Sequence, residues 1–257
     1  IIQGDVLFYF NSVKLLHNWR FVQTAAVDEK VRARIFDDEL TGSSLRYVAT
    51  HEIGHTLGLL HNFRASTAFP VDSLRSASFT QKYGTTPSIM DYARYNYITQ
   101  PGDKGVNLLP PPLGVYDEYA IAWGYRPIPS AATPEDELTT LNQWIREKEH
   151  NPMYLYGQQY FFNSVDPTCQ SEDLGNDAVK AGEYGIKNLK LIMSKLPVWC
   201  VDQNRDYRRL QEAYTEVAEQ LKRYVYHAVM YVGSIYMDDP VAGDGRTNYH
   251  FIDRNTQ

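Results

Sequence analysis

The chain has 257 residues, of which 43% are hydrophobic, so it can bury one large core or two modest ones. Its formal net charge of −6 disfavours a nucleic-acid partner, because proteins that bind nucleic acids usually present a basic face. No apolar run is long enough to form a transmembrane segment. The chain opens at Ile1 without a methionine, so we expect a processed or excised piece, in which a missing secretory signal says nothing about compartment.

The residues before the central motif predict a strand and a helix. Residues 5–11 are rich in aromatic and β-branched side chains, which indicates a short strand. Apolar residues at helical spacing predict a helix over residues 12–27. Residues 62–87 lack a clean period, and residues 101–112 hold four prolines and two glycines, so we expect mostly loop in both segments.

The middle of the chain contains a histidine-rich helix. Ser43 or Ser44 can cap a helix that begins near Leu45, and Gly58 is a natural end for it. A shorter helix is predicted over residues 116–123.

The last third of the sequence is predicted to be mainly helical. Residues 126–134 are rich in proline and resemble a linker, which suggests a domain of residues 1–125 and a helical region of residues 135–257. The helices expected in that region cover residues 134–149, 173–196 and 207–231.

The motif His-Glu-x-x-His-x-x-Gly-x-x-His at residues 51–61 carries the predicted chemistry. On a helix, residues four apart lie on one face, so His51 and His55 converge on one point. Gly58 permits a positive φ, which lets the chain turn and bring His61 to a third ligand position. Three protein ligands plus water are typical of catalytic Zn²⁺, and Glu52 is placed to act as general base. The alternative is a helix with three histidines in ordinary structural roles.

This motif resembles the signature of the metzincin clan of zinc metallopeptidases. Ser88-Ile-Met90-Asp-Tyr92 resembles the methionine turn of that clan, which implies that Met90 forms an apolar floor beneath the ligands. By the same resemblance, the hydroxyl of Tyr92 binds the metal at rest or stabilises the oxyanion; the alternative is a tyrosine packed in the cleft wall. Residues 113–124 resemble the closing helix of the catalytic domain, in which Asp117 would support the methionine turn.

Further segments, among them residues 61–66 and 172–179, resemble the large bacterial zinc-dependent metalloproteases with a Met-zincin domain, which are common in Bacteroidetes. This resemblance implies an extracytoplasmic location. Metzincins carry a twisted sheet before the zinc helix, and substrate adds to its edge strand. We expect most of that sheet to lie outside this chain, with residues 5–11 as its edge or an inner neighbour.

Other candidate residues are given structural interpretations or left open. Cys169 and Cys200 either pair or remain separate buried thiols. Asn62 either bonds a group near the ligands or, as we expect, faces solvent. Three acidic residues lie near a predicted helix start: Glu172, Asp173 and Asp177. They either hold a cation or interact favourably with the helix dipole, and we favour the helix dipole. Four histidines have no partner at ligand spacing: His17, His150, His227 and His250.

The sequence therefore predicts a helix-rich α+β protein: the C-terminal part of a metzincin-like catalytic domain followed by a helical region. The predicted function is a Zn²⁺-dependent endopeptidase acting on protein or peptide. Two alternatives are an inactive metzincin-like binding module and a zinc hydrolase of a non-peptide amide. Neither the cleavage preference nor the oligomeric state follows from the sequence.

Overall fold

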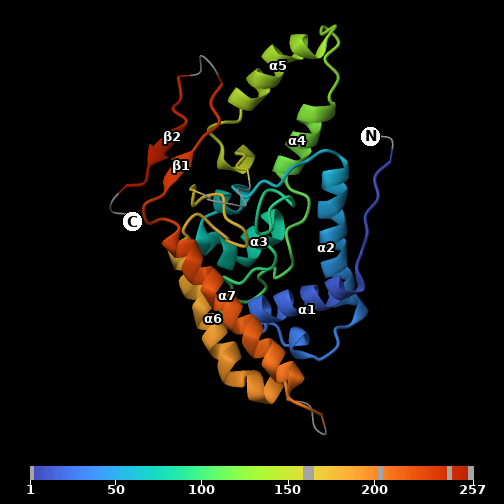
Figure 1. Cartoon of the computed structure of the whole chain (residues 1–257), viewed down its shortest axis with the longest axis vertical. Coiled ribbons are helices and arrows are strands. Elements are labelled where there is room, and N and C mark those ends of the chain that lie inside the picture. The colour runs from blue at the N-terminus through green and yellow to red at the C-terminus, as the bar shows by residue number, and fades with distance from the viewer. Residues whose placement is uncertain (1–2, 159–164, 202–204, 242–244, 254–257) are drawn as a thin grey trace.

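Seven α-helices and one small sheet make up the regular structure of the residues that the computed structural model describes, 3–158, 165–201, 205–241 and 245–253 (Figure 1). The helices are α1 (Phe10–Thr24), α2 (Asp38–Thr56), α3 (Ala77–Tyr83), α4 (Val115–Tyr125), α5 (Pro134–Arg146), α6 (Ala178–Trp199) and α7 (Arg208–Val229). Short 3₁₀ helices cover Lys30–Arg32, Ala65–Ala68, Val71–Arg75 and Pro152–Tyr154. Strands β1 (Ile235–Met237) and β2 (Tyr249–Phe251) pair antiparallel, with Tyr236 opposite His250. The predicted helix-rich α+β class is confirmed.

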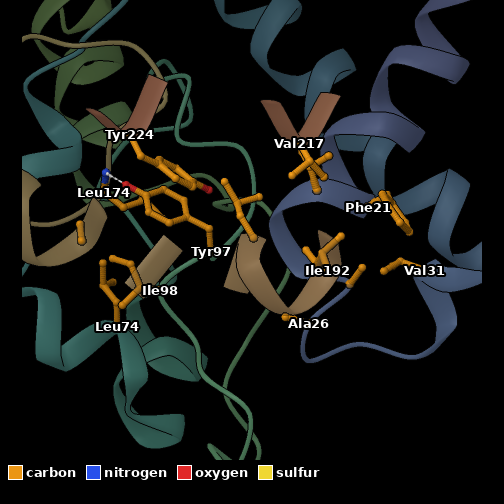
Figure 2. Packing of buried hydrophobic residues seen from close by; sticks show 14 of the residues in the cluster. Phe21, Ala26, Val31, Leu74, Tyr97, Ile98, Leu174, Ile192, Val217 and Tyr224 are labelled. Atoms are coloured by element: carbon orange, nitrogen blue, oxygen red, sulfur yellow. Dashed lines mark hydrogen bonds between the residues drawn. The ribbon is translucent and has the colours of Figure 1, made fainter. Parts of the chain in front are cut away.

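The main hydrophobic core joins the beginning and the end of the chain. Helices α6 and α7 lie side by side, and α1 lies between this pair and the start of α2 (Figure 1). Phe21 of α1, Ile192 of α6 and Val217 of α7 belong to one buried cluster (Figure 2). Residues on both sides of 126–134 therefore share one core. The division into two domains at that segment stays a prediction.

The predicted strand at residues 5–11 is wrong. Residues 5–9 have no regular structure, and α1 begins at Phe10, whose side chain is 94% exposed. The composition favours a strand, but a strand also requires a neighbour for its backbone hydrogen bonds. No described residue supplies such a neighbour to this segment. The helix expected over residues 12–27 is confirmed as α1.

Helix α2 begins seven residues earlier than predicted. Asp37 is its N-cap and accepts a hydrogen bond from the Leu40 backbone N–H at 2.8 Å. Ser43 and Ser44, which were expected to cap the helix, instead donate their hydroxyls to the Leu40 carbonyl. Serine within a helix commonly bonds back to the preceding turn in this way, so it marks a helix start only when no earlier residue can cap. The end of α2 at Thr56 agrees with the prediction.

The loop predicted over residues 62–87 is only partly correct, because it contains α3 and two 3₁₀ helices. Helix α3 is capped by Ser76, which accepts from the Phe79 N–H. Residues 101–112 are irregular, as expected. Helices α4, α5 and α7 lie close to their predicted positions, whereas α6 begins later than predicted, with Asp177 as its N-cap.

The remaining observations concern the cysteines and the membrane. Cys169 and Cys200 are both buried and no disulfide joins them, which settles the alternative that the sequence left open. Among the residues that the structure describes, none of the helices combines the length and the apolar character needed to span a bilayer.

Candidate metal centre

The three predicted histidines converge on one point. His51 and His55 lie one turn apart on α2, which ends two residues before Gly58. Gly58 has φ of +91°, so the chain leaves the helix through the left-handed region, as predicted. This turn places Nε2 of His61 3.1 Å from Nε2 of His55 and 3.2 Å from Nε2 of His51.

In His51 and His55, a hydrogen bond made by Nδ1 leaves Nε2 as the nitrogen that faces the centre. Nδ1 of His51 donates to the Ile89 carbonyl at 2.7 Å, and Nδ1 of His55 donates to the Leu59 carbonyl at 2.8 Å. The lone pairs of both Nε2 atoms are therefore directed at the shared point. Burial lowers the pKa of His51 to about 4, so its ring is neutral at pH 7, as a ligand must be.

The donor set fits a zinc ion. Zinc–nitrogen bonds of about 2.0–2.1 Å in a tetrahedral site put neighbouring nitrogens about 3.3 Å apart. The two Nε2–Nε2 distances of 3.1 and 3.2 Å lie close to that value. The Nε2 atoms of His51 and His55 carry no hydrogen, so both can offer a lone pair to a cation at the point that Nε2 of His61 also reaches.

Met90 lies beneath α2, the helix that carries His51 and His55. Its side chain is fully buried and packs in a small cluster with Tyr47 and Ile89. A Cβ atom placed on Gly54 would collide with Sδ of Met90. Glycine at position 54 therefore allows α2 to approach the thioether closely, a requirement that sequence reasoning missed. The only signal was a glycine inside a helix, where glycine is otherwise unfavourable.

Asp117, which is 2% exposed, holds the turn that carries Met90. Its Oδ1 accepts from the Ser88 hydroxyl at 2.6 Å. Its Oδ2 accepts from the backbone N–H groups of Ile89 and Gly114, both at 2.8 Å. Asp117 thus caps α4 and supports the turn, as the resemblance implied. Because the Ile89 carbonyl accepts from His51, Asp117 is linked through one residue to a candidate metal ligand.

Tyr92 reaches the metal centre from a segment that is otherwise buried. Every residue from Gly84 to Thr99 is buried except Tyr92. Its ring centroid lies 4.5 Å from that of His61 and 5.1 Å from that of His51. Burial raises the pKa of Tyr92, and the charge of Glu52 raises it further, so the phenol keeps its proton at neutral pH. Glu52 itself is half-buried on α2 and close enough to Tyr92 for this electrostatic effect.

Asn62 is buried, so the expectation that it faces solvent is wrong. Its side-chain amide donates to the Leu155 carbonyl at 2.9 Å and accepts from the Gly157 N–H at 3.0 Å. The Phe63 N–H also bonds the Gly157 carbonyl. A segment about a hundred residues further along the chain therefore lies against the third histidine, and no local pattern in the sequence indicated it.

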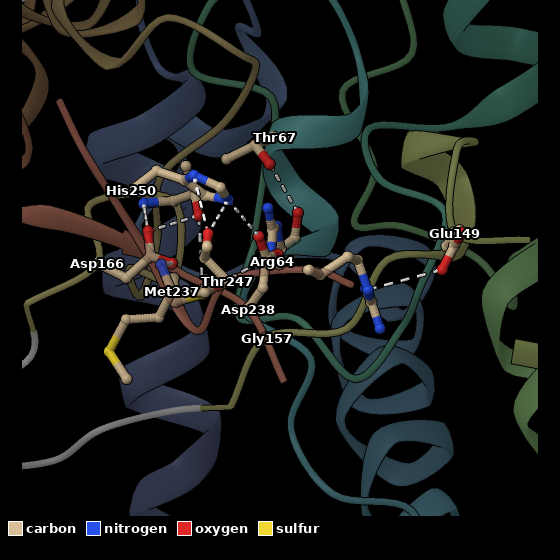
Figure 3. Close-up of polar contacts among 12 residues, drawn as sticks. Arg64, Thr67, Glu149, Gly157, Asp166, Met237, Asp238, Thr247 and His250 are labelled. Atoms are coloured by element: carbon tan, nitrogen blue, oxygen red, sulfur yellow. Dashed lines mark hydrogen bonds and ion pairs between the residues drawn. The ribbon is translucent and has the colours of Figure 1, made fainter. Parts of the chain in front are cut away.

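The C-terminal hairpin is attached near the same place. Arg64 donates from Nη1 to the Met237 carbonyl and forms an ion pair with Asp238 at 2.9 Å (Figure 3). Asp238 also lies 3.3 Å from Nε2 of His250 on β2. The residues that follow the third histidine thus contact several distant parts of the chain.

The acidic residues before α6 do not form a common site. Asp177 caps α6, Asp173 accepts from the Ser66 hydroxyl, and Glu172 forms an ion pair with Arg94. Among the described residues, the three histidines are the one cluster of three or more His, Cys, Asp or Glu side chains placed to hold a metal ion. The favoured helix-terminus interpretation is confirmed for Asp177 and is wrong for Glu172 and Asp173, which lie before the start of α6.

The candidate centre combines two histidines on one helix with a third histidine that follows a glycine turn, and with a glutamate on the same helix. These features define a zinc metallopeptidase-like fold and centre. The family model described as Met-zincin matches residues 33–257, and the chain belongs to that family. The predicted resemblance is therefore confirmed. No curated protein and no solved structure matches the chain.

Proposed function

We propose that the chain is a zinc-dependent metalloendopeptidase that hydrolyses peptide bonds in proteins or peptides. The observation that carries this proposal is the convergence of the Nε2 atoms of His51, His55 and His61 on one point. Membership of the Met-zincin family supports it. The same resemblance favours action outside the cytoplasm, which fractionation of the native cells would test.

The three Nε2 atoms would hold the ion, with Met90 as the apolar floor under the ligands. Zinc, when bound, supplies a Lewis acid that polarises a carbonyl group and makes water a better nucleophile at neutral pH. A carboxylate of Glu52 would take the proton from the attacking water and later deliver it to the nitrogen of the leaving amine. No covalent bond to the protein forms in this scheme.

Tyr92 would donate a hydrogen bond from its hydroxyl to the carbonyl oxygen that gains negative charge during attack. Two features support this role. It is the one unburied residue between Gly84 and Thr99, and its raised pKa keeps the donor proton in place. A tyrosine that only fills the cleft wall would tolerate phenylalanine, which provides a direct comparison.

Replacing Glu52 with glutamine tests the proposal, because glutamine keeps the shape and loses the base. We expect peptide cleavage to fall about 10²–10⁴-fold while zinc content stays near one per chain. The matched control is Glu39→Gln, which neutralises an exposed glutamate in the first turn of the same helix and should cleave normally. Activity would be followed with a quenched peptide library and zinc by elemental analysis.

The outcomes separate the alternatives. Full activity of Glu52→Gln would refute the role of general base. Stoichiometric zinc without cleavage of any peptide by the unmodified protein would favour an inactive binding module. Cleavage of small amides but of no peptide, identified by mass spectrometry of the products, would favour the non-peptide hydrolase.

A further inference from the structure

Two residues with unusual backbone conformations form an ion pair near the metal centre. Arg94 has φ of +51° and Glu172 has φ of +70°, and these are the only non-glycine residues with positive φ in the described part of the chain. Nη2 of Arg94 lies 2.5 Å from Oε1 of Glu172, and each side chain is 8% exposed. The two strained positions are thus direct partners, although they are far apart in sequence.

The ion pair contacts side chains of two helices, α1 and α7. The guanidinium of Arg94 stacks over the ring of Trp19 on α1, with its Cζ 3.5 Å from the ring centroid. Nε of Arg223 on α7 lies 3.4 Å from Oε1 of Glu172, which itself precedes α6. The pair therefore connects the segment after Met90 to the helices at the C-terminal end.

This arrangement is a poor means of stabilising the fold. Burial lowers the pKa of Arg94 to about 10 and raises that of Glu172, so each charge has lost much of its hydration. Nη1 of Arg94 and Oε2 of Glu172 are buried and have no hydrogen-bond partner among the described residues. A buried ion pair with unsatisfied atoms contributes little net stability, and left-handed backbone at both partners subtracts from it. A role in fixing geometry accounts better for its presence.

The geometry that it would fix is that of Tyr92. On one side of Tyr92, the carboxylate of Asp91 accepts from the Ser66 N–H at 2.7 Å and its carbonyl accepts from the Tyr47 hydroxyl at 3.2 Å. On the other side, the left-handed turn at Arg94 redirects the chain two residues later. Tyr92 is the one residue between Gly84 and Thr99 that is partly exposed to solvent, and it lies between the buried residues Asp91 and Arg94.

We propose that Arg94 and Glu172 are positioning residues that hold the hydroxyl of Tyr92 at the metal centre. This proposal rests on the proposed function, because it assigns the ion pair a purpose in the same reaction. It makes the C-terminal helical region part of the catalytic machinery, since Glu172 and Arg223 both belong to that region.

A double-mutant cycle between Glu172→Gln and Tyr92→Phe tests the coupling. We expect Glu172→Gln to lower kcat roughly tenfold with KM changed less than twofold, and to have less than a twofold effect when Tyr92 is already phenylalanine. The control is Asp103→Asn, which breaks the ion pair of Arg75 and Asp103, whose two bonds are each 2.7 Å. That variant should leave kcat unchanged in both backgrounds.

A second readout does not depend on catalysis. In metal-free protein labelled with 3-fluorotyrosine, the ¹⁹F resonance of Tyr92 is assigned by its absence in Tyr92→Phe. We expect Glu172→Gln to shift or broaden that resonance and Asp103→Asn to leave it unchanged. Should Glu172→Gln fail to fold, Arg94→Lys takes its place, because lysine keeps the charge and loses the planar group that stacks on Trp19.

The results distinguish this proposal from the proposed function. An unchanged Tyr92 resonance, or losses that multiply in the double mutant, would overturn the positioning role. If the unmodified protein cleaves no peptide, the proposed function fails, and the ¹⁹F comparison still decides whether the ion pair positions Tyr92.

Discussion

Replacing Asp117 with alanine removes the acceptor of three hydrogen bonds at one buried position. The Ser88 hydroxyl and the N–H groups of Ile89 and Gly114 would lose their partner. Each buried polar group left unsatisfied costs about 1–3 kcal/mol, so we expect the free energy of unfolding to fall by about 3–5 kcal/mol. In Asp117→Asn, the amide oxygen can replace Oδ2 and keep both N–H donors, so only the bond from Ser88 is lost. That variant should cost about 1–2 kcal/mol.

The same substitution should weaken metal binding, because the Ile89 carbonyl orients the ring of His51. Loss of such outer contacts lowers metal affinity about 10–100-fold, which we expect for Asp117→Ala. Urea unfolding of the zinc-free protein measures the stability, and competition with a chromophoric chelator measures the affinity. The control is Asp177→Ala, which removes a helix cap remote from the ligands and should cost about 1 kcal/mol with zinc affinity unchanged. Equal stability of the alanine and asparagine variants, or wild-type zinc affinity in Asp117→Ala, would refute this reasoning.

Two further substitutions test the packing of Met90 beneath α2 and the pH dependence of folding. Gly54→Ala should lower the free energy of unfolding by about 1–2 kcal/mol, measured in urea titrations, because the new methyl group meets Met90. The control is Gly42→Ala, which lies in open space on the same helix and should raise the free energy of unfolding by up to about 1 kcal/mol. Burial lowers the pKa of His227 to about 4, so the unfolded chain takes up a proton at this residue more readily than the folded chain. The stability that the neutral His227 provides is therefore complete above pH 6.5 and is lost as the pH falls towards 4, a change of about 3 kcal/mol. In His227→Gln, which keeps a donor for the Ser171 carbonyl, the slope of stability against pH should be smaller over that range; an unchanged slope would contradict the assignment.

The convergence of His51, His55 and His61 could be predicted because its geometry is local. Because His51 and His55 are four positions apart on one helix, they lie on the same face whatever surrounds them. Glycine readily adopts the φ of +91° found at position 58. The role of Asp117 in supporting the turn followed from resemblance alone, because Ser88 and Ile89, two of its three donors, lie almost thirty residues earlier in the chain. Local spacing could have indicated its bond to the Gly114 N–H but not its bonds to the turn.

The errors have a common physical cause, which is that the deciding contacts are not local. Residues 5–11 have the composition of a strand, but a strand also needs a partner for its backbone, and composition does not report one. Asn62 is polar and follows a turn, which favours solvent, yet residues 155–157 offer it both a carbonyl and an N–H. The ion pair of Arg94 and Glu172 likewise joins segments that no sequence pattern relates.

Cutting the chain within residues 126–134 tests whether they separate two independent units. Residues 1–125 alone would expose the face of α1 around Phe21, which packs in the same cluster as Ile192 and Val217. Losing a single large side chain from a core costs about 2–5 kcal/mol, and this cut removes many at once, against a total stability of about 5–15 kcal/mol. We therefore expect residues 1–125 to show no cooperative unfolding and to bind zinc weakly, measured by circular dichroism and chelator competition. Adding the separate 135–257 fragment should restore both, because the two pieces would rebuild one core; a stable, zinc-binding 1–125 fragment would instead establish the boundary that the sequence suggests.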